Sequence, residues 1–205
     1  LVYSGQTNDC ISIRTINGDF ALHKAGNTNS WLGAKDLLLK VTETNTGYIL
    51  YAENQDRYYF DTNGVLTNII NRCYSNTLTF SYFGAYPTNL LTNVIHNNGQ
   101  YLNLFYESNR LSRIDTPSAN FTMYYYYNVS GELTNATRYI SDINQSVGYL
   151  YDTSGDHCLT QRVNAAGEVF TYLYSGASNK TGWCTNMVLG TNYYQHTLAY
   201  DENYT

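Results

Sequence analysis

The fold is decided by one stretch of sequence, Tyr58-Tyr59-Phe60-Asp61-Thr62-Asn63-Gly64-Val65-Leu66. Side chains two residues apart in a strand share a face, so Tyr58 and Phe60 point to the same side. The Asp61 side chain can accept hydrogen bonds from backbone N–H groups two residues on, which closes a turn. Gly64 can adopt the positive φ that a three-residue hairpin with a bulge requires. The stretch therefore predicts a β-hairpin whose returning strand begins at Leu66.

The same unit recurs along the chain. An aromatic residue followed by an acidic or polar one returns every 21 to 26 residues, at Phe60-Asp61, Tyr82-Phe83, Tyr106-Glu107, Tyr127-Asn128, Tyr151-Asp152, Tyr174-Ser175 and Tyr200-Asp201. The turn motif is complete three times, as Asp61 with Gly64, Asn128 with Gly131, and Asp152 with Gly155. In the third unit Asn109 stands in for the glycine. Such even spacing indicates a repeat architecture in which each hairpin buries its apolar face against its neighbours.

Composition points to the same fold. The 23 tyrosines favour strands, and the abundant Asn and Gly favour the turns between them. Apolar residues keep a helical spacing only around 34–41, which predicts one short helical turn near residues 34–40. We expect an all-β chain, a curved antiparallel sheet of about seven hairpins. Residues 1–44 would be diverged N-terminal strands, and residues 45–205 would hold the hairpins, the last one incomplete.

Charge argues against two classes of partner. Only 13% of residues are charged, the net charge is −5, and the basic residues are scattered singly. A nucleic-acid partner would require clustered Lys and Arg, so none is expected. No apolar run approaches the length that spans a bilayer, so membrane insertion is not expected either.

The four cysteines are widely spaced and form no CxxC pair, which argues against zinc. Two disulfides or four buried thiols fit the residues Cys10, Cys73, Cys158 and Cys184. Cys158 and Cys184 lie about one repeat apart and could fall on adjacent hairpins, although three connectivities remain open. Candidate N-glycosylation sequons agree with an extracellular or cell-surface location and begin at Asn120, Asn128, Asn135, Asn144, Asn179 and Asn203.

No residues form a recognisable catalytic or cofactor-binding set. Metal-ligand spacing is missing among the histidines, which are His23, His96, His157 and His196. Turn hydrogen bonding accounts for the acidic residues at repeat positions, which are Asp61, Asp152 and Asp201. Nothing in the sequence pairs the remaining candidates for a glycosidase, which are Asp115, Asp142 and Asp156. We therefore expect no enzyme activity, no metal and no cofactor.

The run Tyr124-Tyr125-Tyr126-Tyr127 allows two interpretations. In a strand, alternate rings face opposite sides, so two would join the aromatic ladder of the sheet and two would lie outside. Outward tyrosines together with Trp31 and Trp183 could instead bind glycans. A carbohydrate-binding or adhesive module is thus the alternative to a purely structural one.

The chain resembles the YD-repeat, or RHS-repeat, family of bacterial RHS proteins, toxin-complex cocoon subunits and teneurins. The family pattern is aromatic-x-Tyr-Asp-x-x-Gly-x-Leu, followed by a lead-in to the next hairpin. Segments similar to that lead-in are Asn76-Thr77-Leu78-Thr79-Phe80-Ser81-Tyr82, Gly99-Gln100-Tyr101-Leu102-Asn103-Leu104-Phe105-Tyr106 and Gly167-Glu168-Val169-Phe170-Thr171-Tyr172-Leu173-Tyr174. The match is best over residues 45–176.

The resemblance implies a long β-sheet that spirals into a shell, which in larger members encloses a toxin or forms a rigid scaffold. The hairpins of this chain would then form an open spiral or partial shell. The family's self-cleaving C-terminal core motif is missing from this sequence, so autoproteolysis is not expected. About seven repeats are too few to close a hollow shell. The chain would then be an encapsulating fragment of a larger toxin-type protein or a short member with another use for its sheet edges.

An open strip of hairpins has unpaired backbone groups at both ends. The sequence stops within a repeat, at Tyr200-Asp201. We therefore expect self-association, in which the edge of one copy extends the sheet of the next to give a filament or surface fibre.

Overall fold

The structure is a computed structural model. It describes residues 2–3, 10–15, 18–24, 28–33, 39–117, 121–140, 143–153, 157–175, 183–190 and 194–198. Strands and turns make up all of these segments, and none of them contains a helix. The predicted helical turn at 34–40 lies mostly outside them. At its end the prediction is wrong, because Leu39 is not helical and Lys40 begins a strand.

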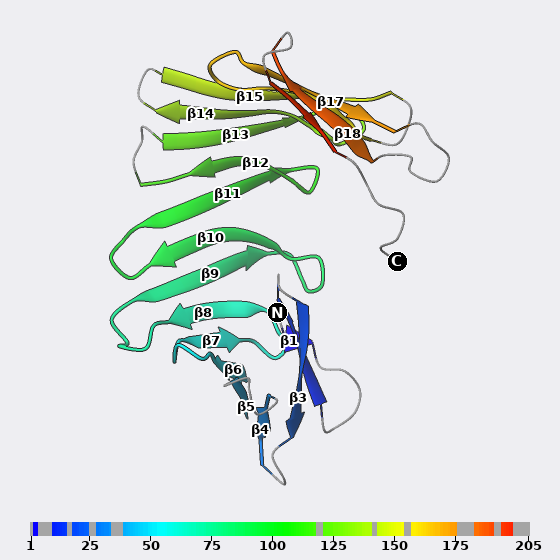
Figure 1. The fold of residues 1–205 in the computed structure, drawn as a ribbon. Coiled ribbons are helices and arrows are strands. Elements are labelled where there is room, and N and C mark those ends of the chain that lie inside the picture. The colour runs from blue at the N-terminus through cyan, green and yellow to red at the C-terminus, as the bar shows by residue number, and fades with distance from the viewer. Residues whose placement is uncertain are drawn as a thin grey trace. The chain divides into compact units, whose positions relative to one another are not determined.

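The chain divides into two compact units, residues 1–104 and 105–205. Unit 1 contains β1 (Val2–Tyr3), β2 (Cys10–Thr15), β3 (Gly18–Lys24), β4 (Ser30–Leu32), β5 (Lys40–Thr44), β6 (Gly47–Tyr51), β7 (Arg57–Phe60), β8 (Leu66–Ile70), β9 (Thr77–Phe83) and β10 (Leu90–His96). Strand β11 (Tyr101–Glu107) begins in unit 1 and ends in unit 2. Each strand of unit 1 pairs antiparallel with the next one along the chain, as the hairpin repeat predicts (Figure 1).

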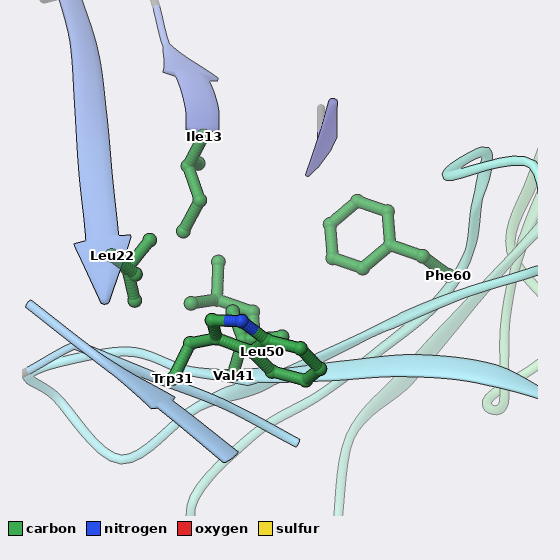
Figure 2. Packing of buried hydrophobic residues seen from close by; sticks show 6 residues of the cluster. All are labelled: Ile13, Leu22, Trp31, Val41, Leu50 and Phe60. Carbon is green, nitrogen blue, oxygen red and sulfur yellow. The ribbon is translucent and has the colours of Figure 1, made fainter. Parts of the chain in front are cut away.

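The sheet of unit 1 is rolled around a core. Ile13, Leu22, Trp31, Val41, Leu50 and Phe60, one residue from each of β2 to β7, form a single buried cluster. Figure 2 shows these side chains pointing toward one another. In a flat sheet β2 and β7 would be roughly 24 Å apart, because neighbouring strands are about 4.8 Å apart. The shared cluster therefore requires a strongly curved sheet, with one face turned inward.

Cross-strand register explains which residues reach this core. Trp31 lies opposite Val41, and Val41 lies opposite Leu50 in the antiparallel ladder. Leu50 in turn lies opposite Tyr58, whose i+2 neighbour Phe60 is only 5% exposed. Residues directly opposite each other share a face, so one apolar stripe runs from strand to strand. Trp31 is thus a core residue, which corrects the expectation that it faces outward to bind a glycan.

Unit 2 is built from the same kind of hairpin without such a core. Its further strands are β12 (Arg110–Asp115), β13 (Phe121–Tyr127), β14 (Leu133–Ile140), β15 (Ile143–Tyr151), β16 (Leu159–Val163), β17 (Val169–Tyr174), β18 (Cys184–Leu189) and β19 (Tyr194–Thr197). From β12 onward each pairs antiparallel with the next. Among the described residues of this unit, Thr137 is the one buried side chain. Unit 2 is therefore a single-layer sheet whose two faces are both partly open to solvent.

The tyrosine run on β13 follows the predicted alternation. The hydroxyl of Tyr127 donates a hydrogen bond to the carbonyl of Leu111, and Tyr125 is partly buried on the same face. Tyr126 is exposed on the other face. Tyr124, also on that face, makes an edge-to-face contact with Tyr139, with 5.3 Å between the ring centroids. The prediction of two rings on each side is confirmed.

Gly47 marks a close approach between two turns of unit 1. Its φ is +141°, and a Cβ at this position would overlap the carbonyl oxygen of Phe60 and the backbone of Asp61. Gly47 is itself buried. The β5–β6 hairpin can lie against the Phe60-Asp61 turn only because residue 47 has no side chain.

Replacing Gly47 with alanine should therefore destabilise the protein by on the order of 3 kcal/mol, because backbone has to move to make room. Gly99→Ala is the matched control. Gly99 also has a positive φ, +89°, but nothing lies within 4 Å of the added Cβ. It should cost about 1 kcal/mol, the strain of the backbone conformation alone. Chemical denaturation of both variants measures the difference, and equal losses would show that the close approach at Gly47 is unimportant.

Candidate functional site

The turn motif of the first complete repeat has the predicted geometry. The Oδ1 atom of Asp61 accepts hydrogen bonds from the backbone N–H of Asn63 at 2.8 Å and of Val65 at 2.9 Å. Gly64 has a φ of +78°, and its N–H donates to the carbonyl of Asp61. The carboxylate therefore organises the hairpin turn.

The second repeat motif has the same turn. Oδ1 of Asn128 accepts a hydrogen bond from the N–H of Glu132 at 3.0 Å, and Gly131 has a φ of +85°. In the third, Oδ1 of Asp152 accepts from the N–H of Cys158 at 3.3 Å, across a longer turn. Gly155 lies outside the described residues. Asn109, expected to replace glycine, has a φ of +61°.

Equivalent turns occur at the opposite ends of the strands, where sequence reasoning did not place them. Oδ1 of Asn164 accepts from the N–H of Glu168 at 3.0 Å, and Gly167 has a φ of +80°. Oδ1 of Asn71 likewise accepts from the N–H of Ser75 at 3.0 Å. The signal was an asparagine followed three residues later by a residue that adopts a positive φ.

The anchor tyrosines join successive hairpins. Three of them donate the hydroxyl proton to the backbone carbonyl of the leucine at the start of the previous returning strand. The three O–H···O=C contacts are Tyr82 to Leu66 at 2.8 Å, Tyr127 to Leu111 at 2.9 Å, and Tyr174 to Leu159 at 2.7 Å. Burial raises the pKa of Tyr82, with a smaller contribution from nearby Asp61. The first anchor, Phe60, has no hydroxyl and is a core residue instead.

A hydroxyl residue near the start of six returning strands forms a second repeated contact. Its side chain donates to a carbonyl on the outgoing strand, at 3.1 to 3.2 Å. The donors are Thr67, Thr92, Ser112, Thr134, Thr160 and Thr185. In five of these hairpins the register shifts at this point, as at a β-bulge. Sequence reasoning missed this role, although the hydroxyl residue directly follows a leucine in five of the six cases and follows Cys184 in the sixth.

Two grooves lie between successive turns at one end of the unit 2 strands. We call the first the acidic groove. It has a volume of about 410 Å³ and is lined by Asn128, Ser130, Glu132, Thr134, Tyr149, Leu150, Tyr151, Asp152, Thr153 and His157. We call the second the basic groove. It has a volume of about 290 Å³ and is lined by Glu107, Ser108, Arg110, Ser112, Tyr125, Tyr126, Tyr127 and Asn128. Both are open and lined by a mixture of tyrosine and polar side chains.

Glu132 contacts two other side chains of the acidic groove. Its Oε2 accepts a hydrogen bond from Nδ2 of Asn128 at 2.5 Å, and its Oε1 lies 2.6 Å from Nδ1 of His157. The pKa of Glu132 is lowered first by the hydrogen bond from Asn128 and next by that from His157. The contact with His157 links the turns of two consecutive repeats.

In the basic groove, Arg110 makes the corresponding link. Its guanidinium lies over the ring of Tyr127, 6.0 Å from the centroid. A Cβ at Gly131 would overlap that guanidinium, so Arg110 also rests against the turn of the following repeat. The two grooves thus have the same architecture. The residue before the returning leucine lines each of them, and it is Arg110 in the basic groove and Glu132 in the acidic groove.

The structure does not support disulfides. All four cysteines are among the described residues, and none forms a disulfide. Cys73 is in an exposed turn, and Cys158 and Cys184 lie on either side of β17, so a strand separates them.

Among the sequons, Asn135 accepts hydrogen bonds from Thr137 and Ser146, both at 2.7 Å. Asn128 is the turn residue described above, Asn144 is exposed on β15, and three fall outside the described residues: Asn120, Asn179 and Asn203.

The described residues contain no group of three or more His, Cys, Asp or Glu placed to hold a metal ion. His23 is exposed on β3 and His196 on β19, whereas the Nδ1 atom of His96 accepts a turn N–H from Asn98 at 3.1 Å. Asp115 lies 3.1 Å from Nε of Arg113, while Asp142, Asp156 and Asp201 are outside the described residues.

In the part of the chain that is described, no helix is long and apolar enough to cross a membrane.

Comparison with known proteins finds similarity in structure and not in sequence. No family model matches the chain, and no curated protein does. The crystal structure of TcdB2-TccC3-TEV matches 91% of this chain with a TM-score of 0.54 and 12% identity. This chain spans only 12% of the length of that one. A porin-like protein from Bacteroides uniformis matches with a TM-score of 0.42 and 11% identity, over 92% of each chain. The first match shows a shared fold.

Removing the hydroxyl of an anchor tyrosine should weaken the protein. Tyr127→Phe deletes the hydrogen bond to Leu111 and should cost about 1 kcal/mol of unfolding free energy. Tyr126→Phe, on the exposed face of the same strand, should change it by less than about 0.5 kcal/mol. Urea denaturation of both variants tests this. If both lose the same stability, the tyrosine hydroxyls do not join the hairpins.

The pKa of Glu132 should respond to its two partners. Because the pKa of Glu132 is lowered in the folded chain, its interactions stabilise the fold at neutral pH. This contribution is lost as the pH falls through the folded pKa. His157→Gln should raise the pKa of Glu132, because the imidazole hydrogen bond that lowers it is removed. Asn128→Ala should raise it further, since that hydrogen bond lowers it most. A carboxyl-carbon NMR titration checks both, and an unchanged pKa in both variants would contradict the described contacts.

Proposed function

We propose that this chain is a structural, extracellular YD-repeat module that extends its sheet by pairing edge strands with other copies, building a shell or filament. The observation that carries the proposal is the way its hairpins are joined. Each strand pairs with its chain neighbours, and the anchor tyrosines bind one hairpin to the next. An architecture that grows by adding identical strands has no built-in stop.

Two further observations support this function. The TcdB2-TccC3-TEV structure shares the fold of this chain, and the repeat itself resembles the YD-repeat family, whose larger members form shells. Within their own units, β1 pairs along one edge with β2, and β19 pairs along one edge with β18. The side chains of Gln195, His196 and Thr197 on β19 are exposed, and at neutral pH they present no charged carboxylate or amine to repel an added strand.

The proposal predicts concentration-dependent assembly that charge on the edge strand suppresses. Light scattering and negative-stain microscopy of the purified chain should show extended oligomers that lengthen with protein concentration. The double variant Gln195→Lys/Thr197→Lys should shift the chain toward monomer, because lysines on an edge strand repel an added one.

A matched double variant separates the edge from general surface charge. Leu150 and Leu173 are 57% and 50% exposed, on β15 and β17, which have neighbouring strands on both sides. Leu150→Lys/Leu173→Lys should therefore leave assembly unchanged. A wild-type chain that stays monomeric at every concentration would refute the proposal. Equal suppression by both double variants would refute the role of the edge.

A further inference from the structure

The acidic and basic grooves are successive copies of one site. In the basic groove, Arg110 immediately precedes the returning leucine and lies over Tyr127, the anchor of the next repeat. In the acidic groove, Glu132 immediately precedes the returning leucine and lines the same hollow as Tyr151, the next anchor. The chain supplies a guanidinium to the first site and a carboxylate to the second. The acidic groove therefore has an anchor tyrosine without the cation that its neighbour receives.

Cations over aromatic rings are a recurring feature of this protein. Arg57 lies between the rings of Tyr51 and Tyr74, with its guanidinium carbon 5.4 and 4.4 Å from their centroids. Other basic side chains over rings are Lys24, Lys40, Arg110, Arg113, Arg138 and Arg162. No lysine or arginine is among the residues that line the acidic groove. Its tyrosines thus differ from Tyr127 in the basic groove, which has Arg110 over its ring.

The lining of the acidic groove has the chemistry that recognises a guanidinium. Tyr149 and Tyr151 provide aromatic faces, to which a planar cation is attracted. Glu132 and Asp152 provide carboxylates, and each carboxylate oxygen can accept more than one hydrogen bond. His157 lies at the rim, with 63% of its side chain exposed. The two carboxylates outnumber this single imidazole, so the groove has a net negative charge.

We infer that the acidic groove binds an arginyl side chain presented by a partner protein. The guanidinium would stack on the Tyr149 and Tyr151 rings and donate hydrogen bonds to Glu132 and Asp152, as Arg110 stacks on Tyr127 one repeat earlier. Arginine fits better than lysine because its planar group can stack on a ring and at the same time donate two parallel hydrogen bonds to a carboxylate. This site is independent of the edge pairing proposed above.

The test uses a single arginine in peptide-like form, N-acetyl-arginine methylamide, added to the full chain and followed by amide NMR. Binding should shift the resonances of residues around the acidic groove. The citrulline analogue has the same shape without the charge and should bind at least ten-fold more weakly. Equal binding of the two compounds, shifts that map elsewhere, or no shifts at millimolar ligand would each overturn the inference.

Two variants and a control locate the site. Glu132→Gln removes one negative charge and should weaken arginine binding about ten-fold. Glu132→Arg places the chain's own guanidinium in the groove, as in the basic groove, and should abolish binding. Glu107→Gln removes a carboxylate that lines the basic groove and should change nothing. Circular dichroism confirms that each variant is folded. Unaltered affinity in a folded Glu132→Arg chain would rule out the acidic groove as the binding site.

Discussion

The hydrogen bond from an anchor tyrosine to the leucine carbonyl of the preceding hairpin is the contact on which the repeat depends. Tyr82, Tyr127 and Tyr174 all make it, with 2.7 to 2.9 Å between the oxygens. A hairpin alone is at best marginally stable in water. The tyrosine lies on one strand and donates its hydroxyl proton to a carbonyl of the adjacent, preceding strand. This side-chain hydrogen bond adds to the backbone hydrogen bonds between strands. This role explains why these three anchor positions hold tyrosine and not phenylalanine.

The two units show how far this contact can replace a core. Unit 1 rolls its sheet and buries six side chains from β2 to β7 in one cluster. Unit 2 has one buried side chain, Thr137, among its described residues, yet it continues the same hairpin pattern. There, hydroxyl contacts at the bulges and cations over aromatic rings occur along the sheet. Unit 2 thus has almost no central hydrophobic packing. Contacts between neighbouring strands recur along its sheet instead.

The turn residues of the repeat keep one role, whereas a neighbouring position varies from repeat to repeat. Turn carboxamides and carboxylates such as Asp61 and Asn128 hold the backbone, so their chemistry is used within the fold. The residue before the returning leucine points into the groove between repeats and is free to change. Arg110 and Glu132, which have opposite charge, occupy this position in consecutive repeats and line neighbouring grooves. Variation at one position of a fixed frame is how a repeat protein acquires a binding surface without altering its scaffold.

The sequence by itself determined the hairpin, its turn residues and the alternation of the tyrosine run, because all three follow from contacts a few residues apart. Asp61 and Gly64 act within one turn, and a strand has a period of two whatever surrounds it. The partner of each tyrosine hydroxyl, the burial of Trp31 and the closeness of Glu132 to His157 were decided only by tertiary structure. Those contacts join residues up to about 25 positions apart, and they depend on strand register and sheet curvature. Neither property can be obtained from local sequence, since it is set by how all the hairpins pack together.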